Sequence, residues 1–153
     1  MGLDMYLHAK QYTSESNVFS KAGVYTMLKE ALGDDSKHLV KDSPSISVEM
    51  KVGQWRKSNQ IHKYFVENCQ DGEDDCRESY VSRETLTELL DLCKQVLADH
   101  SKAEELLPNQ EGFFFGSTNY DELYFSDLED TVAILENCLT MDHSWDFHYQ
   151  SSW

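Results

Sequence analysis

The residues with the clearest capacity for chemistry lie together between Trp55 and Glu78. The block opens with an aromatic ring followed by two cations, in Trp55, Arg56 and Lys57. The aromatic ring can stack on a planar ring, and the two cations can contact phosphates. The amide of Asn59 and the imidazole of His62, shortly after them, can hydrogen-bond to the edge of a base. The block therefore predicts a site for a nucleotide, a cyclic oligonucleotide or a similar phosphorylated ligand, formed by Trp55, Arg56, Lys57, Asn59 and His62.

The same block also has a purely structural interpretation. Arg56 and Lys63 would pair with nearby carboxylates, and Trp55 would anchor a helix. His62 falls on the apolar face of that helix, where a histidine with both nitrogens hydrogen-bonded belongs to the core. The sequence leaves these two interpretations open.

Carboxylates cluster in the loop that follows, around Gly72. Clustered oxygen ligands suit calcium and magnesium. The spacing here does not match the Asp-x-Asp-x-Asp-Gly loop, so we interpret the segment as a solvated acidic turn and predict no metal site. The carboxylates concerned are Asp71, Glu73, Asp74 and Asp75.

The four cysteines form no C-x-x-C pair, so zinc ligation is not supported. Cys93 and Cys138 lie on apolar helical stripes and are predicted to be buried. Cys69 and Cys76 bracket the acidic loop, and a persistent disulfide between them is not expected in a reducing compartment.

An enzyme is the third alternative. Its centre would be a Cys69 or Cys76 nucleophile with His62 as base, or a metal cluster at Asp71, Asp74 and Asp75. The chain has no glycine-rich phosphate loop, no Gly-x-Ser-x-Gly elbow and no His-Glu-x-x-His motif. The sequence therefore favours a protein without catalytic residues or cofactor over an enzyme of unknown reaction.

The charge is confined to one part of the chain. Residues 1–65 carry nine Lys/Arg against seven Asp/Glu, whereas residues 66–153 carry four against twenty-one. Such a field repels nucleic acid and anionic membranes, and it attracts basic surfaces, including protein grooves that normally hold nucleic acid. The open alternative is that the acidity is only that of many soluble proteins and selects no partner. The predicted acidic interaction surface comprises Asp71, Glu73, Asp74, Asp75, Asp121, Glu122, Asp127, Glu129, Asp130 and Glu136.

The elements that must position these residues follow from apolar periodicity. Alternation predicts strands near 3–12, 46–53 and 143–150, and helical spacing predicts helices near 17–32, 55–68, 82–98 and 120–139. Ser82 is a candidate N-cap, and the run from Gly112 to Gly116 is predicted to be a short buried strand or a plug in the core. This order predicts a single α+β domain over residues 1–153, with a mostly antiparallel small sheet.

No membrane span or signal peptide is expected. The first residues lack a basic region followed by an apolar run, and no segment approaches about 18 consecutive apolar residues. At 153 residues the chain suits one domain of intracellular type.

Four blocks of the chain stand out: MGLDMYL at 1–7, VGQWRKSNQIHKYFV at 52–66, NCQDGEDDCRE at 68–78 and GFFFGS at 112–117. These blocks resemble a family of small uncharacterised proteins encoded by bacteriophages and prophages, and the resemblance spans most of the chain. It implies no known activity, but it implies a setting: accessory phage proteins act in the host cytoplasm and commonly modify or block host systems.

Together these observations favour a phage-encoded, non-enzymatic accessory protein. Its acidic surface would occupy a basic, nucleic-acid-binding surface of a host protein, for instance a component of a defence system, which makes the chain an anti-CRISPR candidate. Carboxylates would then stand in for phosphates, and salt would weaken the binding. The alternative is the nucleotide-type ligand site at Trp55, Arg56, Asn59 and His62.

Overall fold

The sheet is organised around β1 (Asp4–Ser14), whose side chains alternate between two environments. Met5, Leu7 and Ala9 are fully buried, and the residues between them are partly exposed. This period of two is the pattern of a sheet with one covered face. The computed structural model describes residues 2–16 and 23–153.

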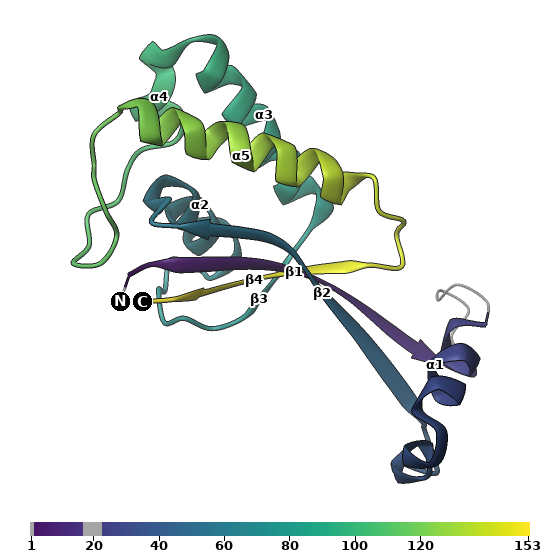
Figure 1. The fold of residues 1–153 in the computed structure, drawn as a ribbon. Helices are drawn as coiled ribbons and strands as arrows, with labels where there is room; N and C mark the ends of the chain where they lie inside the picture. Colours follow the sequence, from purple (N-terminus) through teal and green to yellow (C-terminus); the bar gives the residue numbers. More distant parts are fainter. Residues whose placement is uncertain (1, 17–22) are drawn as a thin grey trace.

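The four strands found in the described residues are all antiparallel, in the order β2-β1-β4-β3. The others are β2 (Ser45–Arg56), β3 (Ser79–Val81) and β4 (Asp146–Ser152). β4 lies between β1 and β3, and Asp4 of β1 pairs with Ser152. The first and last strands are therefore neighbours, and both chain ends lie at the same end of the sheet (Figure 1).

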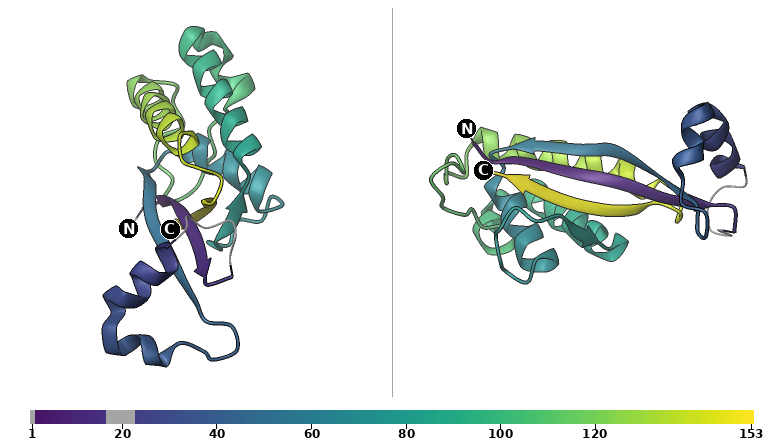
Figure 2. Two further views of the ribbon diagram at one scale, coloured as in Figure 1. Left: turned by 90° about the vertical axis from the view of Figure 1, so that its right-hand side faces the viewer. Right: turned by 90° about the horizontal axis from the view of Figure 1, so that it is seen from below.

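Helices cover one face of the sheet. They are α2 (Asn59–Cys69), α3 (Arg83–Ala98) and α5 (Glu122–Leu139), with the short α4 (Ala103–Leu106) and a 3₁₀ turn (His100–Lys102) after α3. Seen from below, the strands lie in front of the helices (Figure 2). Leu86, Leu89, Leu128 and Leu135 of the helices share one core with Phe147. The predicted α+β class with an antiparallel sheet is confirmed.

The β1–β2 pair extends past the end of β4 as a two-stranded ribbon. β4 pairs only as far as Lys10, whereas β1 and β2 stay paired to Ser14 and Ser45. The far end of the ribbon carries α1 (Val24–Leu32) and a 3₁₀ helix (Gly33–His38), as Figure 1 shows. Residues 17–22 of the helix predicted over 17–32 lie outside the described residues.

The helix predicted over 55–68 begins later than expected. Trp55 and Arg56 belong to β2, because they pair with Met5 and Asp4 of β1. Lys57 then adopts a left-handed conformation, with φ of 60°, and its N–H donates to the Leu3 carbonyl. This turn separates strand from helix, so α2 begins only at Asn59.

Two other segments differ from the predictions. The run from Gly112 to Gly116 forms a turn rather than a strand: the Phe115 ring is buried, but Phe113 is 95% exposed. β3, which was not predicted, has only three residues and depends on pairing with β4. Such a short strand leaves no periodic signal in the sequence.

The helices α3 and α5 match their predicted ranges, and local capping explains where they begin. The Ser82 hydroxyl accepts a hydrogen bond from the N–H of Thr85, and the Asp121 carboxylate accepts bonds from those of Leu123 and Tyr124. Each cap satisfies N–H groups that have no partner inside the helix.

Gly53 allows α5 to approach the sheet closely. A Cβ atom at this position would lie 2.8 Å from Cγ2 of Ile134 and 3.2 Å from Cβ of Leu7. The first distance is shorter than a carbon–carbon contact permits, so any side chain here would push α5 away from β2.

We predict that Gly53→Ala lowers the free energy of unfolding by about 1–3 kcal/mol, the usual cost of overpacking a core. Urea unfolding measures the change. Gln54→Ala is the matched control, because Gln54 is exposed on the same strand. Equal stability of the two variants would contradict the close approach.

Candidate functional site

The fold buries three of the five residues predicted to bind a nucleotide. Trp55 is 4% exposed and donates its indole N–H to the Thr131 hydroxyl of α5, at 2.9 Å. Its ring contacts that of Phe65 in the core. Trp55 therefore joins β2 to α5 and presents no free face for a ligand to stack on.

Asn59 holds a loop instead of facing solvent. Its amide nitrogen donates to the carbonyls of Phe115 and Ser117, at 3.1 and 2.9 Å. Its amide oxygen accepts from the N–H of Gln110, at 2.9 Å. The first residue of α2 thus fixes the loop that runs from Gln110 to Ser117.

His62 is fully buried and has a partner at each ring nitrogen. Nε2 lies 2.9 Å from a carboxylate oxygen of Asp74, and Nδ1 lies 2.7 Å from the hydroxyl of Tyr149. An ionised carboxylate can only accept, so in the neutral ring Nε2 carries the proton and Nδ1 accepts from Tyr149. This arrangement matches the structural interpretation of His62 as a hydrogen-bonded core histidine.

The Tyr149 hydroxyl, which is hydrogen-bonded to His62, is not an activated nucleophile. Burial, with the nearby Asp74 charge, raises the pKa of Tyr149 well above its ordinary value, so the hydroxyl stays protonated. The other oxygen of Asp74 accepts from the indole N–H of Trp153, at 3.0 Å. The chain of contacts therefore ties α2, β4 and the acidic loop together.

Cys69, Cys93 and Cys138 lie in surroundings that suppress reactivity. Burial raises the pKa of the Cys69 thiol to about 11 and that of Cys93 to about 12, so both stay neutral at pH 7. Cys93 and Cys138 are buried, as predicted. The hydrogen bonds of His62 leave neither ring nitrogen free to activate a cysteine.

The acidic loop is folded around a cation of its own. The guanidinium of Arg77 lies 3.5 Å from a carboxylate oxygen of Glu73, 3.7 Å from Asp75 and 3.8 Å from Asp71. It also donates to the carbonyl of the buried Gln70. No group of three or more His, Cys, Asp or Glu side chains within residues 2–16 and 23–153 is arranged to hold a metal ion.

Arg56 and Lys57, the remaining two predicted ligand residues, line a cleft of about 210 Å³. Its walls come from the β2–α2 junction, the loop around Gly116 and the first turns of α5. Two members of the predicted acidic surface, Asp121 and Asp127, lie in the same cleft. The fold therefore brings together residues that the sequence assigned to two different sites.

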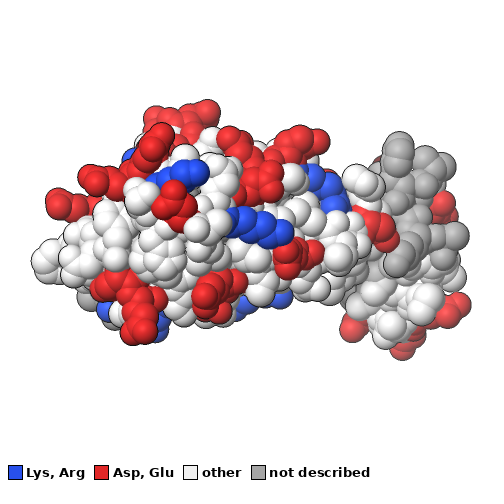
Figure 3. Space-filling view, turned by 90° about the horizontal axis from the view of Figure 1, so that it is seen from above, with Lys and Arg blue, Asp and Glu red and all other residues white. Residues whose placement is uncertain are grey.

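The other predicted carboxylates of α5 lie on the outer side of the helical layer, with those of α3. Residues 83–139 carry thirteen Asp/Glu against three Lys/Arg. Figure 3 views the molecule from above, and carboxylates are spread over it with few cations between them. We call the exposed carboxylates of α3 and α5 the acidic helical layer: Glu84, Glu88, Asp91, Glu122, Glu129, Asp130 and Glu136.

Within the part of the chain that the structure describes, only one carboxylate of this layer has a cation within 4.0 Å. Glu136 pairs with Lys94 at 2.7 Å. Arg83, the other cation of α3, instead donates to the carbonyl of Asp142 and lies over the ring of Phe147. The negative field of the layer is therefore largely uncompensated.

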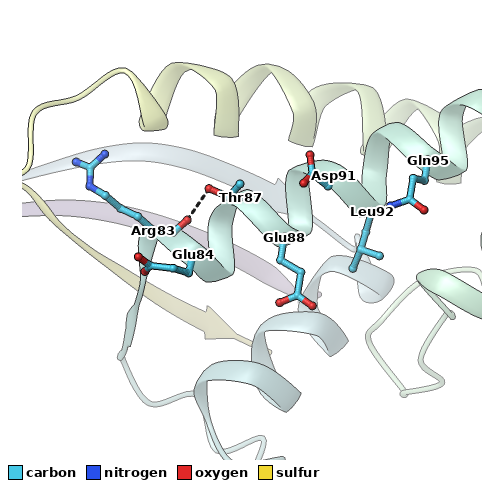
Figure 4. A pocket seen from close by; sticks show the side chains of 7 residues that line it. All are labelled: Arg83, Glu84, Thr87, Glu88, Asp91, Leu92 and Gln95. Carbon is cyan, nitrogen blue, oxygen red and sulfur yellow. Dashed lines mark hydrogen bonds between the residues drawn. The ribbon is translucent and has the colours of Figure 1, made fainter.

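The α3 part of the layer borders an open groove of about 580 Å³ (Figure 4). Glu84, Glu88 and Asp91 lie along it, with Leu92 as an apolar contact. These carboxylates lie outside the acidic surface predicted from the sequence. Their spacing of four and three residues along a predicted helix was a signal that could have found them.

No helix in the described residues is both long and apolar enough to cross a lipid bilayer. In comparisons with known proteins, no family model, no curated protein and no solved structure matches this chain.

We predict that Tyr149→Phe lowers the free energy of unfolding by about 1–3 kcal/mol, because it leaves the buried Nδ1 of His62 without a donor. Urea unfolding at neutral pH measures the change. The control is Tyr80→Phe, which removes a hydroxyl from an exposed ring on the neighbouring strand. If both variants lose the same small amount, the Tyr149 bond does not anchor β4.

Arg77 generates a second prediction. Arg77→Gln should lower the melting temperature, and added salt should recover part of the loss, since screening replaces the removed counter-charge. Wild-type protein should gain no more from magnesium or calcium than from sodium chloride of equal ionic strength. A divalent-specific gain abolished by Asp74→Asn with Asp75→Asn would instead show that the loop binds a metal.

Proposed function

We propose that this protein is a non-enzymatic accessory protein that binds a basic, nucleic-acid-binding surface of a host protein through its acidic helical layer. The observation that carries the proposal is the row of carboxylates on α3 and α5 that have no cation beside them in the described residues. Carboxylates on two packed helices can occupy positions where a bound nucleic acid would place phosphates.

The contacts of the acidic loop support the helical layer, and not the loop, as the main surface for the partner. Asp71, Glu73 and Asp75 surround Arg77, and Asp74 accepts from His62 and Trp153. A basic partner would have to compete with these internal cations and donors. The loop is therefore secondary to the helical layer, whose carboxylates make few internal contacts.

The phage setting of the proposal rests on the resemblance of the four sequence blocks. The buried state of Trp55, Asn59 and His62 gives no support to a nucleotide stacked between them. The complete engagement of His62 and the raised pKa of Cys69 likewise give no support to a thiol enzyme. A protein that acts through its surface charge is consistent with all of these features.

The test is affinity capture from bacterial lysate at low salt, followed by mass spectrometry of the bound proteins. We expect a basic protein whose binding weakens steeply with salt and is displaced by DNA or RNA. Recovery of no basic partner, or of one whose binding ignores salt, would contradict the proposal.

A charge-matched pair of variants makes the test specific to the surface. Glu84→Gln with Glu129→Gln and Asp130→Asn should weaken binding by about tenfold or more, because each removes a long-range attraction. The control, Asp34→Asn with Asp35→Asn and Asp42→Asn, removes the same charge from the segment after α1. An equal loss in the control would mean that net charge, and not the helical layer, drives binding.

A further inference from the structure

The cleft at the β2–α2 junction is a second feature of the molecule that the proposed function does not use. It is bounded by two stretches far apart in sequence, residues 56–60 and 109–127, and its volume is about 210 Å³. Pockets for drug-sized ligands usually start at roughly 300 Å³, so the size of this one suits a smaller molecule.

The charges in the cleft are balanced but not paired with each other. Arg56 and Lys57 are present with Asp121 and Asp127. Within the described residues, the one ion pair made by any of these four is that of Arg56 with Asp4 of β1, at 3.8 Å. Two cations and two carboxylates thus share a small space without contacts shorter than 4.0 Å between them.

The polar lining is held in place by the fold. Gln60 is only 2% exposed although it lines the cleft, and its amide nitrogen donates a long hydrogen bond of 3.4 Å to the Asp127 carboxylate. Burial, with Asp130 and Asp121 nearby, raises the pKa of Asp127. A positive charge bound in the cleft would stabilise the ionised form of Asp127, which burial disfavours.

Lys57 is positioned by a strained backbone. Its φ of 60° is unfavourable for a residue other than glycine. Its N–H donates to the carbonyl oxygen of Leu3, and a Cβ atom on Gly116 would lie 3.0 Å from the Lys57 Cβ. Strain of this kind persists where the surrounding structure imposes it, and it is concentrated at functional sites.

We propose that the cleft binds a small zwitterion of the α-amino-acid class. Its carboxylate would contact the cations of Arg56 and Lys57, and its ammonium group would contact the carboxylates of Asp121 and Asp127. Guanidinium and carboxylate groups form strong paired hydrogen bonds, which favours a carboxylate at Arg56. The two carboxylates of the cleft disfavour a polyanion such as a nucleotide.

The experiment is isothermal titration of the full chain with each standard α-amino acid in turn, and with acetate and methylamine as single-charge probes. At least one amino acid should bind at one site per chain, at least tenfold more tightly than either probe. If no amino acid binds, or if acetate binds as tightly as the best of them, the proposal is wrong.

Two variants locate the site without unfolding the protein. Lys57→Asn and Asp127→Asn should each weaken binding at least tenfold, and Glu88→Gln, in the α3 groove, should leave it unchanged. Asparagine tolerates the left-handed backbone at position 57. Amino-acid binding that survives both cleft variants at full strength would place the ligand elsewhere and overturn the proposal.

The stability of Asp127→Asn provides the folding control. A carboxyl whose pKa is higher in the folded than in the unfolded protein destabilises the fold once the pH exceeds its ordinary range, and it has no such effect at lower pH. Asp127→Asn should therefore be at least as stable as wild type at pH 7, with the advantage lost in acid. Weaker binding by this variant then reports on the site and not on folding.

Discussion

The hydrogen bonds of one buried histidine join α2, the acidic loop and β4, and the position of α2 decides where the residues of the cleft lie. Both ring nitrogens of His62 are used, one by Asp74 in the loop after α2 and one by Tyr149 in β4. Removing either partner would leave a polar nitrogen in the core without compensation. The Tyr149 ring stacks on Phe65, one turn along the same helix, so packing and hydrogen bonding fix α2 on β4 together. The position of α2 in turn places Asn59, which holds the loop that forms one wall of the cleft.

This internal framework separates the charged residues into three groups with different capacities. Carboxylates of the loop after α2 are engaged by Arg77, His62 and Trp153. Those of α3 and α5 point away from the core, and most have no cation beside them. Asp121 and Asp127 share a cleft with Arg56 and Lys57. Counting charges along the chain treats the three groups alike. Of the three, the carboxylates of α3 and α5 offer a broad negative field to a partner, and the cleft offers a small site of mixed charge.

Sequence patterns predicted those features that depend on neighbours along the chain. The period of Leu86, Leu89 and Cys93 located α3, and Ser82 located its start. Features that depend on pairing between distant segments were missed. Trp55 and Arg56 were placed in a helix because the pairing of β2 with β1 that extends the strand to them leaves no local signal. The central position of Arg77 among the loop carboxylates was also missed, because its spacing in the sequence does not show that the loop folds around it. The cleft joins residues 56–60 with residues 109–127, and no local pattern relates the two.

The place of β4 in the sheet has a consequence for how the chain is made. Residues 146–152 form the strand that joins β1 to β3, so during synthesis the sheet stays incomplete until they leave the ribosome. Until then the inner edge of β1 offers unpaired backbone groups, and contacts between such distant segments form slowly. Closure by the chain's own residues 146–152 does not depend on protein concentration, whereas exchange of this strand with a second chain would, as in domain swapping. Refolding at low protein concentration therefore favours closure of the sheet within one chain.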